Sequence, residues 1–289
     1  MRTFIGVFIL VITGLLIAII IGARMSIATK NETSIYRIFE FEEYPVEIWQ
    51  ELKGKKIFFG HQSVGYDLIR GMKDVVNEQP HISLEFFEIS ESLSANVGII
   101  NHCKIGRNAS PESKVRAFRK ILLENGDAEI DIALMKFCYV DVSRDSNPKE
   151  ILDLYVATIS ELRVQFPDTV FVHMTVPVES MPQSAKDVLK HFVKMLLGRP
   201  GVVEDNRVRH QYNELLRRQY SGKEPVFDLA AFESVDAKGN LTVRTYGPDK
   251  VEFMDPQKTE DGGHLNEFGR KDVGGRLLVL LAEIASAQQ

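Results

Sequence analysis

The chain has 289 residues, of which 44% are hydrophobic and 26% charged, as is ordinary for a globular protein. Its net charge of -5 and isoelectric point near 5.9 argue against nucleic acid as the main partner. The two cysteines, Cys103 and Cys138, are too few for a disulfide framework and lack the spacing of metal ligands. One disulfide between them and two buried thiols are both open interpretations, and the thiols are favoured.

The N-terminal segment is strongly apolar. Residues 3–23, "TFIGVFILVITGLLIAIIIGA", carry no charge, and about 20 such residues suffice to cross a membrane as a helix. A signal peptide cleaved after Ala28 is the alternative, but its apolar region is usually shorter. The flanking charges are too balanced to orient the segment. The short tail before it and the long domain after it favour an extracytoplasmic domain, either membrane-anchored or secreted.

The rest of the chain divides into a lead-in and a domain. We expect residues 1–26 to be the anchor or signal peptide and residues 27–52 a stalk with a short helix, from which Trp49 packs on the domain. Residues 53–289 have the size of one α/β domain.

Short apolar runs alternate with longer helical patterns along this domain. The runs predict strands at Lys56–Gly60, Ser83–Ile89, Ile130–Tyr139, Thr169–Pro177 and Pro225–Leu229. Most are continuously apolar, as expected where helices cover both faces of a parallel sheet.

The segments between the strands have helical periodicity. Helices are predicted at Val64–Asn77, Pro111–Asn125, Pro148–Gln165, Gln183–Leu197, Asn206–Tyr220 and Asn266–Ala287. The alternation predicts a three-layer α/β/α sandwich around a five-stranded, parallel, doubly wound sheet of flavodoxin-like type. Residues 231–262 lack a helical period, and "NLTVRTY" within them predicts a hairpin.

The stretch "FFGHQSVG" (58–65) places a serine where the first strand ends and a helix begins. Gly60 and Gly65 permit a tight turn, and the helix start supplies free N–H groups beside Ser63. The carboxyl edge of a parallel sheet is where functional loops gather. Ser63 is therefore a candidate nucleophile, or else a residue that only caps the helix.

A second polar loop, "DGGHLNEFG" (261–269), precedes the last helix. A histidine that acts as a general base needs a carboxylate to orient it, and Asp261 lies three residues before His264. In a doubly wound fold this loop can return to the edge where the first strand ends. We expect it to meet the Ser63 turn, although a solvated loop with a capping aspartate is the alternative.

The stretches "FFGHQSVG", "KIGRN" and "DGGHLNEFG", in this order, resemble the sequence blocks of the SGNH/GDSL hydrolase superfamily over roughly residues 54–285. The resemblance implies the SGNH hydrolase fold. It implies Ser63 as nucleophile, His264 as general base and Asp261 as the acid that orients the base. It also implies that the backbone N–H of Gly106 helps form an oxyanion hole.

The chain departs from this superfamily in two places. The first block usually reads Gly-Asp-Ser, whereas this chain has His61 and Gln62 before the serine. The third block usually supplies an asparagine that donates to the oxyanion and is followed by an aspartate, but "LMKFCYVDV" (134–142) has no asparagine. If Asp141 matches that aspartate, the resemblance places Val140 where the asparagine is expected. A missing donor costs about 3 to 4 kcal/mol of transition-state stabilisation unless it is replaced. Asn108 is the candidate replacement, with the N–H of Ser63 or Val64 as a further donor; an ordinary turn residue is the alternative for Asn108.

Three residues near these blocks are candidates for contact with substrate: His61, Gln62 and Tyr139. A hydrogen-bonded structural role is favoured for His61, and a core role for Tyr139. A zinc site built from His61, Asp261 and His264 is an alternative because these residue types bind zinc, but their spacing matches no zinc signature, so we expect no metal.

The resemblance implies a serine esterase that needs no cofactor. With the apolar N-terminus, it indicates an O-acyl ester on a carbohydrate or cell-envelope glycan as substrate. Two alternatives stay open: an O-acyltransferase that uses the same residues, and a catalytically silent module that binds a glycan or a partner. The missing asparagine favours the silent module, whereas Ser63 and the Asp-x-x-His pattern favour catalysis. The oligomeric state is not predicted.

Overall fold

The computed structural model describes residues 44–89, 93–94, 96–182 and 201–288. The apolar segment 3–23, most of the predicted stalk and the predicted helix 183–197 lie outside these residues. Within the described ranges, no helix combines the length and the apolar character that a membrane crossing requires.

The domain is built on a six-stranded sheet whose paired strands all run parallel. The strand order is β2-β3-β1-β4-β5-β6, so β1 lies inside the sheet between β3 and β4. In chain order the strands are β1 (Lys56–His61), β2 (Glu85–Glu88), β3 (Ile99–Lys104), β4 (Ile132–Met135), β5 (Val170–Met174) and β6 (Val226–Phe227).

The sheet therefore has one strand more than the five predicted. Strand β3 was missed because Asn101 and His102 interrupt its apolar run, yet both side chains are buried. Each finds a partner inside the protein: the amide of Asn101 donates to the Ile57 carbonyl, and His102 contacts His61. Polar side chains that are paired in this way can be buried without a large penalty.

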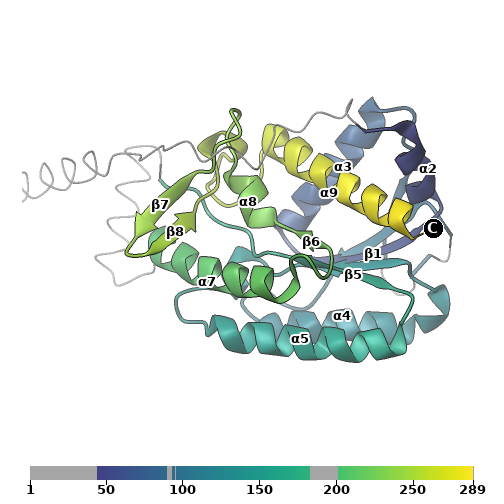
Figure 1. Ribbon diagram of the computed structural model, residues 1–289, viewed down its shortest axis with the longest axis horizontal. Helices are drawn as coiled ribbons and strands as arrows, with labels where there is room; N and C mark the ends of the chain where they lie inside the picture. Colours follow the sequence, from purple (N-terminus) through teal and green to yellow (C-terminus); the bar gives the residue numbers. More distant parts are fainter. Residues whose placement is uncertain (1–43, 90–92, 95, 183–200, 289) are drawn as a thin grey trace, which may run out of the picture. The chain divides into compact units, whose positions relative to one another are not determined.

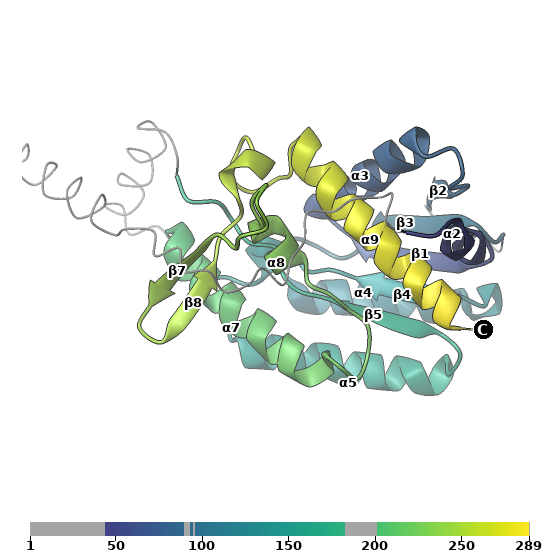
Figure 2. The same ribbon diagram turned by 45° about the horizontal axis from the view of Figure 1, so that its top comes forward.

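Helices cover both faces of the sheet, which gives the predicted three layers (Figures 1 and 2). One face carries α2 (Val46–Lys53), α3 (Val64–Glu78), α8 (Leu229–Ser234) and α9 (Glu267–Ala287). The other carries α4 (Pro111–Glu124), α5 (Pro148–Gln165) and α7 (Val202–Tyr220). Helix α2 is the expected lead-in helix, and its Trp49 is buried in the core. The predicted hairpin is present as β7 (Val243–Tyr246) and β8 (Asp249–Glu252), which pair antiparallel.

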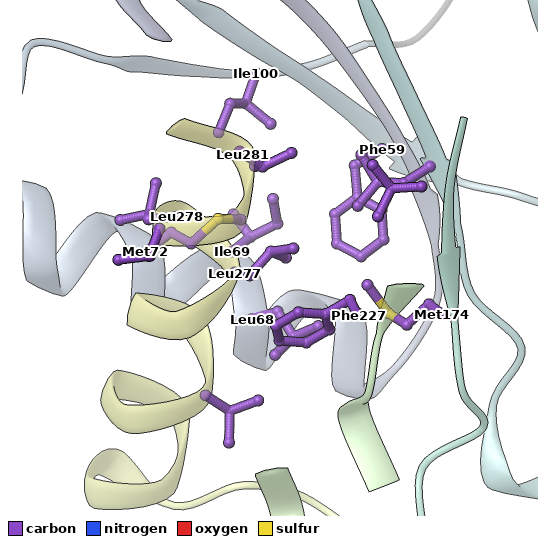
Figure 3. Close-up of a cluster of buried hydrophobic side chains, with 14 of the residues drawn as sticks. Phe59, Leu68, Ile69, Met72, Ile100, Met174, Phe227, Leu277, Leu278 and Leu281 are labelled. Carbon is purple, nitrogen blue, oxygen red and sulfur yellow. The ribbon is translucent and has the colours of Figure 1, made fainter. Parts of the chain in front are cut away.

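Helices α3 and α9 lie directly against each other on one face. Their apolar side chains form a shared core with the sheet, in which Leu68, Met72, Leu277 and Leu281 are among the buried residues (Figure 3). The backbones approach so closely that a Cβ atom at Gly71 would lie 1.7 Å from the carbonyl oxygen of Arg270. Glycine is thus required at this crossing.

We predict that Gly71→Ala destabilises the fold, because the added methyl group meets backbone that cannot move without separating the two helices. The free energy of unfolding, measured by urea denaturation, should fall by about 1 to 3 kcal/mol or more. Gly126→Ala is the control, since its methyl group would meet only the Phe166 ring at 3.7 Å. Equal stabilities of the two variants would contradict this account of the crossing.

Candidate active site

The Ser63 turn joins the carboxyl end of β1 to α3. Ser63 has φ 47° and ψ -113°, a conformation that non-glycine residues rarely adopt. Such strain is typical of functional turns. Gly65 is needed beside it, because a Cβ there would lie 2.3 Å from Cβ of His61. Although Ser63 holds the N-cap position, its hydroxyl makes no cap hydrogen bond to the helix, so the alternative of a merely capping serine does not describe it.

The hydroxyl of Ser63 instead faces the loop before α9. Its Oγ lies 2.7 Å from Nε2 of His264, and Nδ1 of the same ring lies 2.7 Å from Oδ2 of Asp261. A carboxylate accepts but does not donate, so Nδ1 carries the proton and Nε2 can accept the hydrogen of Ser63. The three side chains thus form one hydrogen-bonded line.

Asp261 also shapes its own loop. Its Oδ1 accepts hydrogen bonds of 2.8 Å from the N–H groups of Gly263 and His264. Partial burial acts to raise the pKa of Asp261, but these hydrogen bonds outweigh it and hold the pKa below its usual value. The carboxyl group is therefore ionised at neutral pH and can hold the imidazole in one tautomer.

Tyr139 packs against the other side of this loop. Its ring meets the His264 ring edge-on with 6.0 Å between centroids, and a Cβ at Gly263 would lie 3.2 Å from it. The buried Arg209 donates through Nε to the Tyr139 carbonyl at 2.9 Å. The Tyr139 ring thus packs against the side of the His264 imidazole. The predicted contact of Tyr139 with substrate remains a prediction.

The loop after β3 lies beside the Ser63 turn. Gly106 has φ +56°, and a Cβ there would lie 2.5 Å from the backbone nitrogen of Lys114, so no other residue fits without strain. The side-chain amide of Gln62 donates to the carbonyls of Ile105 at 3.1 Å and Gly106 at 2.7 Å. Asn108 is exposed and accepts a hydrogen bond of 3.1 Å from Nζ of Lys114.

In the loop after β4, Val140 stands at the position expected for the asparagine; it is apolar and 37% exposed. The neighbouring Asp141 is buried, forms an ion pair with Lys114 and accepts a 2.6 Å hydrogen bond from the N–H of Cys138. The other donors expected for an oxyanion lie in the turns after β1 and β3, at Ser63, Gly106 and Asn108.

His61 lies beneath the Ser63 turn and is fully buried. Its Nε2 lies 3.1 Å from Nδ1 of His102, and Tyr66 packs edge-on against its ring. Burial lowers the pKa of His61 well below its ordinary value, with further lowering by the charge of His102, and burial lowers the pKa of His102 to about 4. Both rings are therefore neutral near pH 7 and act as a packed, hydrogen-bonded pair, the structural alternative considered for His61.

The cysteines are free thiols, both buried. Cys138 donates through Sγ to the carbonyl of Gln62 at 3.6 Å, and burial raises the pKa of Cys103 to about 11. In the described ranges no group of three or more His, Cys, Asp or Glu side chains is arranged to hold a metal ion.

Asp67 was missed by the sequence reasoning. It lies one helical turn after Ser63, is buried, and accepts a hydrogen bond of 3.4 Å from the N–H of Leu265, next to His264. Burial raises its pKa, while the charge of His264 acts in the opposite direction. A charged residue on the apolar face of α3 was the signal that could have revealed it.

A buried carboxyl group lies further inside, in α8. Glu233 is fully buried, accepts a hydrogen bond of 2.8 Å from the N–H of Val178, and interacts electrostatically with Lys136 and Asp67. Burial raises its pKa to about 8 from an ordinary value of 4.5. Between about pH 4.5 and pH 8, the Glu233 carboxyl group is therefore protonated in the native protein and ionised in the unfolded chain.

We predict that Glu233 makes a contribution to stability that falls as pH rises from about 5 to about 8, since this carboxyl group keeps its proton in the native state and loses it in the unfolded chain. Each pKa unit of difference corresponds to about 1.4 kcal/mol. Glu233→Gln should remove this contribution, so its free energy of unfolding in urea should decrease less, or increase more, between pH 5 and 8 than that of wild type, whereas the exposed Glu124→Gln should match wild type. An unchanged pH dependence in Glu233→Gln would show that this carboxyl group is already ionised in the fold.

Comparison with known proteins finds likenesses in solved structures alone. The sequence matches no protein-family model and no curated protein. Similar structures include the periplasmic domain of a lipopolysaccharide acetyltransferase from Salmonella ser. Paratyphi A, at 13% identity and TM-score 0.41 over 78% of this chain and 85% of that one. They also include an acetyl esterase variant with acetate ion, at 12% identity and TM-score 0.41 over 79% and 98%. A protein assigned to the lipolytic G-D-S-L family from Desulfitobacterium hafniense matches at 8% identity and TM-score 0.43 over 80% and 99%.

Proposed function

We propose that this protein is a serine-dependent acyl hydrolase that cleaves an ester. The observation that carries the proposal is the line from Ser63 through His264 to Asp261, with 2.7 Å at each step. A nucleophile, a base within hydrogen-bond reach and a group that orients the base are the parts that nucleophilic catalysis needs. The strained turn at Ser63 supports the same proposal, because its hydroxyl is kept from the helix and directed at the base.

The reaction has two stages. In the first, Nε2 of His264 takes the hydroxyl proton while Oγ of Ser63 bonds to the ester carbonyl carbon, and the carbonyl oxygen becomes an oxyanion. The tetrahedral intermediate then loses the alcohol, which receives the proton from His264, and an acyl-serine remains. Throughout this stage Asp261 stabilises the imidazolium and keeps its ring in place.

In the second stage His264 takes a proton from water, and the resulting hydroxide attacks the acyl-serine. The carbon–oxygen bond to Ser63 breaks, Oγ regains a proton from His264, and the carboxylic acid leaves. Backbone N–H groups of Ser63 and Gly106 serve as donors to both oxyanions. An alcohol in place of water would make the same residues an O-acyltransferase.

We further propose an O-acyl group on a cell-envelope glycan as the substrate, with the domain held outside the cytoplasm by its N-terminal segment. The support for this part is the uncharged run at residues 3–23, whose length suits a membrane crossing. A silent glycan-binding module is the second candidate, favoured by the apolar Val140 at the position of the usual asparagine.

The first test is labelling of the full-length protein with a fluorophosphonate, which reacts with activated serines. Wild type should be labelled and Ser63→Ala should not. His264→Ala should lower the labelling rate by at least about a thousand-fold, because the serine loses its base. His81→Ala, which removes an exposed histidine of the segment after α3, is the matched control and should label as wild type. An unlabelled wild type that still binds glycan would favour the silent module.

A second test concerns Asp261. Asp261→Asn should lower kcat/KM for p-nitrophenyl acetate, because an amide can donate to Nδ1 and so favours the wrong tautomer. A buried aspartate in this role contributes about 10⁴-fold. The carboxylate here is 58% exposed, and solvent screening should reduce the loss to about 10²-fold. Unchanged kinetics in Asp261→Asn would remove this residue from the mechanism while leaving Ser63 and His264 in it.

A further inference from the structure

Gln62 occupies an unusual place between the two turns that would supply oxyanion donors. It directly precedes Ser63, and its side-chain nitrogen reaches across to the loop after β3. Because both of its contacts there are carbonyl oxygens, only the NH₂ end of the amide satisfies them, which settles the orientation of the side chain. The residue is half-buried, and its side-chain nitrogen contacts these two backbone carbonyls.

The contact with Ile105 determines the direction of an N–H group. The carbonyl of Ile105 and the N–H of Gly106 belong to the same peptide unit, and in a planar trans peptide these two groups point in opposite directions. When Nε2 of Gln62 holds the Ile105 oxygen at 3.1 Å, it therefore also orients the Gly106 N–H away from itself. The second contact, 2.7 Å to the Gly106 oxygen, restrains the next peptide unit.

The same argument applies to the Ser63 N–H. It shares a peptide unit with the backbone carbonyl of Gln62, and that carbonyl accepts hydrogen bonds from the Gly65 N–H at 2.9 Å and from Sγ of Cys138 at 3.6 Å. The backbone of Gln62 is thus part of the peptide unit that carries the Ser63 N–H. Its side chain holds the peptide unit that carries the Gly106 N–H. In the part of the chain that the structure describes, neither the Ser63 N–H nor the Gly106 N–H has an acceptor of its own.

We infer that Gln62 is a positioning residue. It fixes the directions of the N–H groups of Ser63 and Gly106, which act as the two donors of the oxyanion hole. The inference rests on the proposed function and explains how the site manages with Val140 where a side-chain donor is expected. Two backbone N–H groups suffice for an oxyanion hole when their directions are restrained. Gln62 itself does not touch the reacting atoms.

The test compares Gln62→Met and Gln62→Glu with wild type in the full-length protein. Neither methionine nor an ionised glutamate can donate to Ile105 and Gly106, while both keep the side-chain length. A donor displaced by about 1 Å can cost about 100-fold in rate. We expect kcat for p-nitrophenyl acetate to fall by about 10- to 100-fold with KM within about two-fold of wild type. The fluorophosphonate labelling rate should fall in parallel.

Gln219→Met, an exposed glutamine of α7, is the matched control and should leave kcat unchanged. Wild-type kcat in both folded Gln62 variants would overturn the inference while leaving the proposed function intact. A raised KM with unchanged kcat would also overturn it, in favour of a direct contact between Gln62 and substrate. If Gln62→Met does not fold, Gln62→Glu alone decides between these results. A wild type that neither turns over ester nor takes the label would remove the proposed function and this inference together.

Discussion

The contact between α3 and α9 is the constraint on which the candidate site depends. Ser63 directly precedes α3, and His264 lies just before α9, so the packing of the two helices brings the two residues together. Gly71 allows the backbones to approach closely, and the ion pair of 2.8 Å between Asp74 and Arg270 restrains how far one helix can slide along the other. An imidazole must lie within about 3.2 Å of the hydroxyl it deprotonates. A small shift of this helix pair would therefore separate nucleophile and base without altering either loop.

Hydrogen bonds tie the turns at the carboxyl edge of the sheet to one another. Gln62 joins the turn after β1 to the loop after β3, and Cys138 joins the turn after β1 to the loop after β4. The buried ion pair of Lys114 and Asp141 connects the start of α4 to the same loop after β4. Burying such charges contributes little net stability, but breaking one partner leaves an unpaired charge at high cost. This network restrains the turns at the carboxyl edge of the sheet. A preorganised oxyanion site requires such rigidity, because its donors must already point at the developing charge.

Much of the fold follows from local patterns. The five apolar runs, and every predicted helix that falls within the described ranges, are present. A strand covered on both faces requires a continuous apolar run, and an amphipathic helix requires apolar residues at a fixed period. Strand β3 is not predicted from the sequence because Asn101 and His102 are polar residues. They are compatible with a core only because partners on neighbouring elements pair with them. Asp67 was missed for the same reason, since its partner lies 198 positions away.

Local sequence patterns were enough to identify the candidate nucleophile and the candidate base with its carboxylate. A serine at a strand-to-helix junction and an Asp-x-x-His loop before a helix are local patterns, each readable within about ten residues. Only the tertiary structure decided that Ser63 and His264, 201 positions apart, share a hydrogen bond and that the Ser63 hydroxyl does not cap its own helix. It also decided that Gln62 faces backbone carbonyls. The reason is physical: local sequence sets backbone preference and burial, whereas the direction of a side chain or an N–H group depends on partners that only folding brings near.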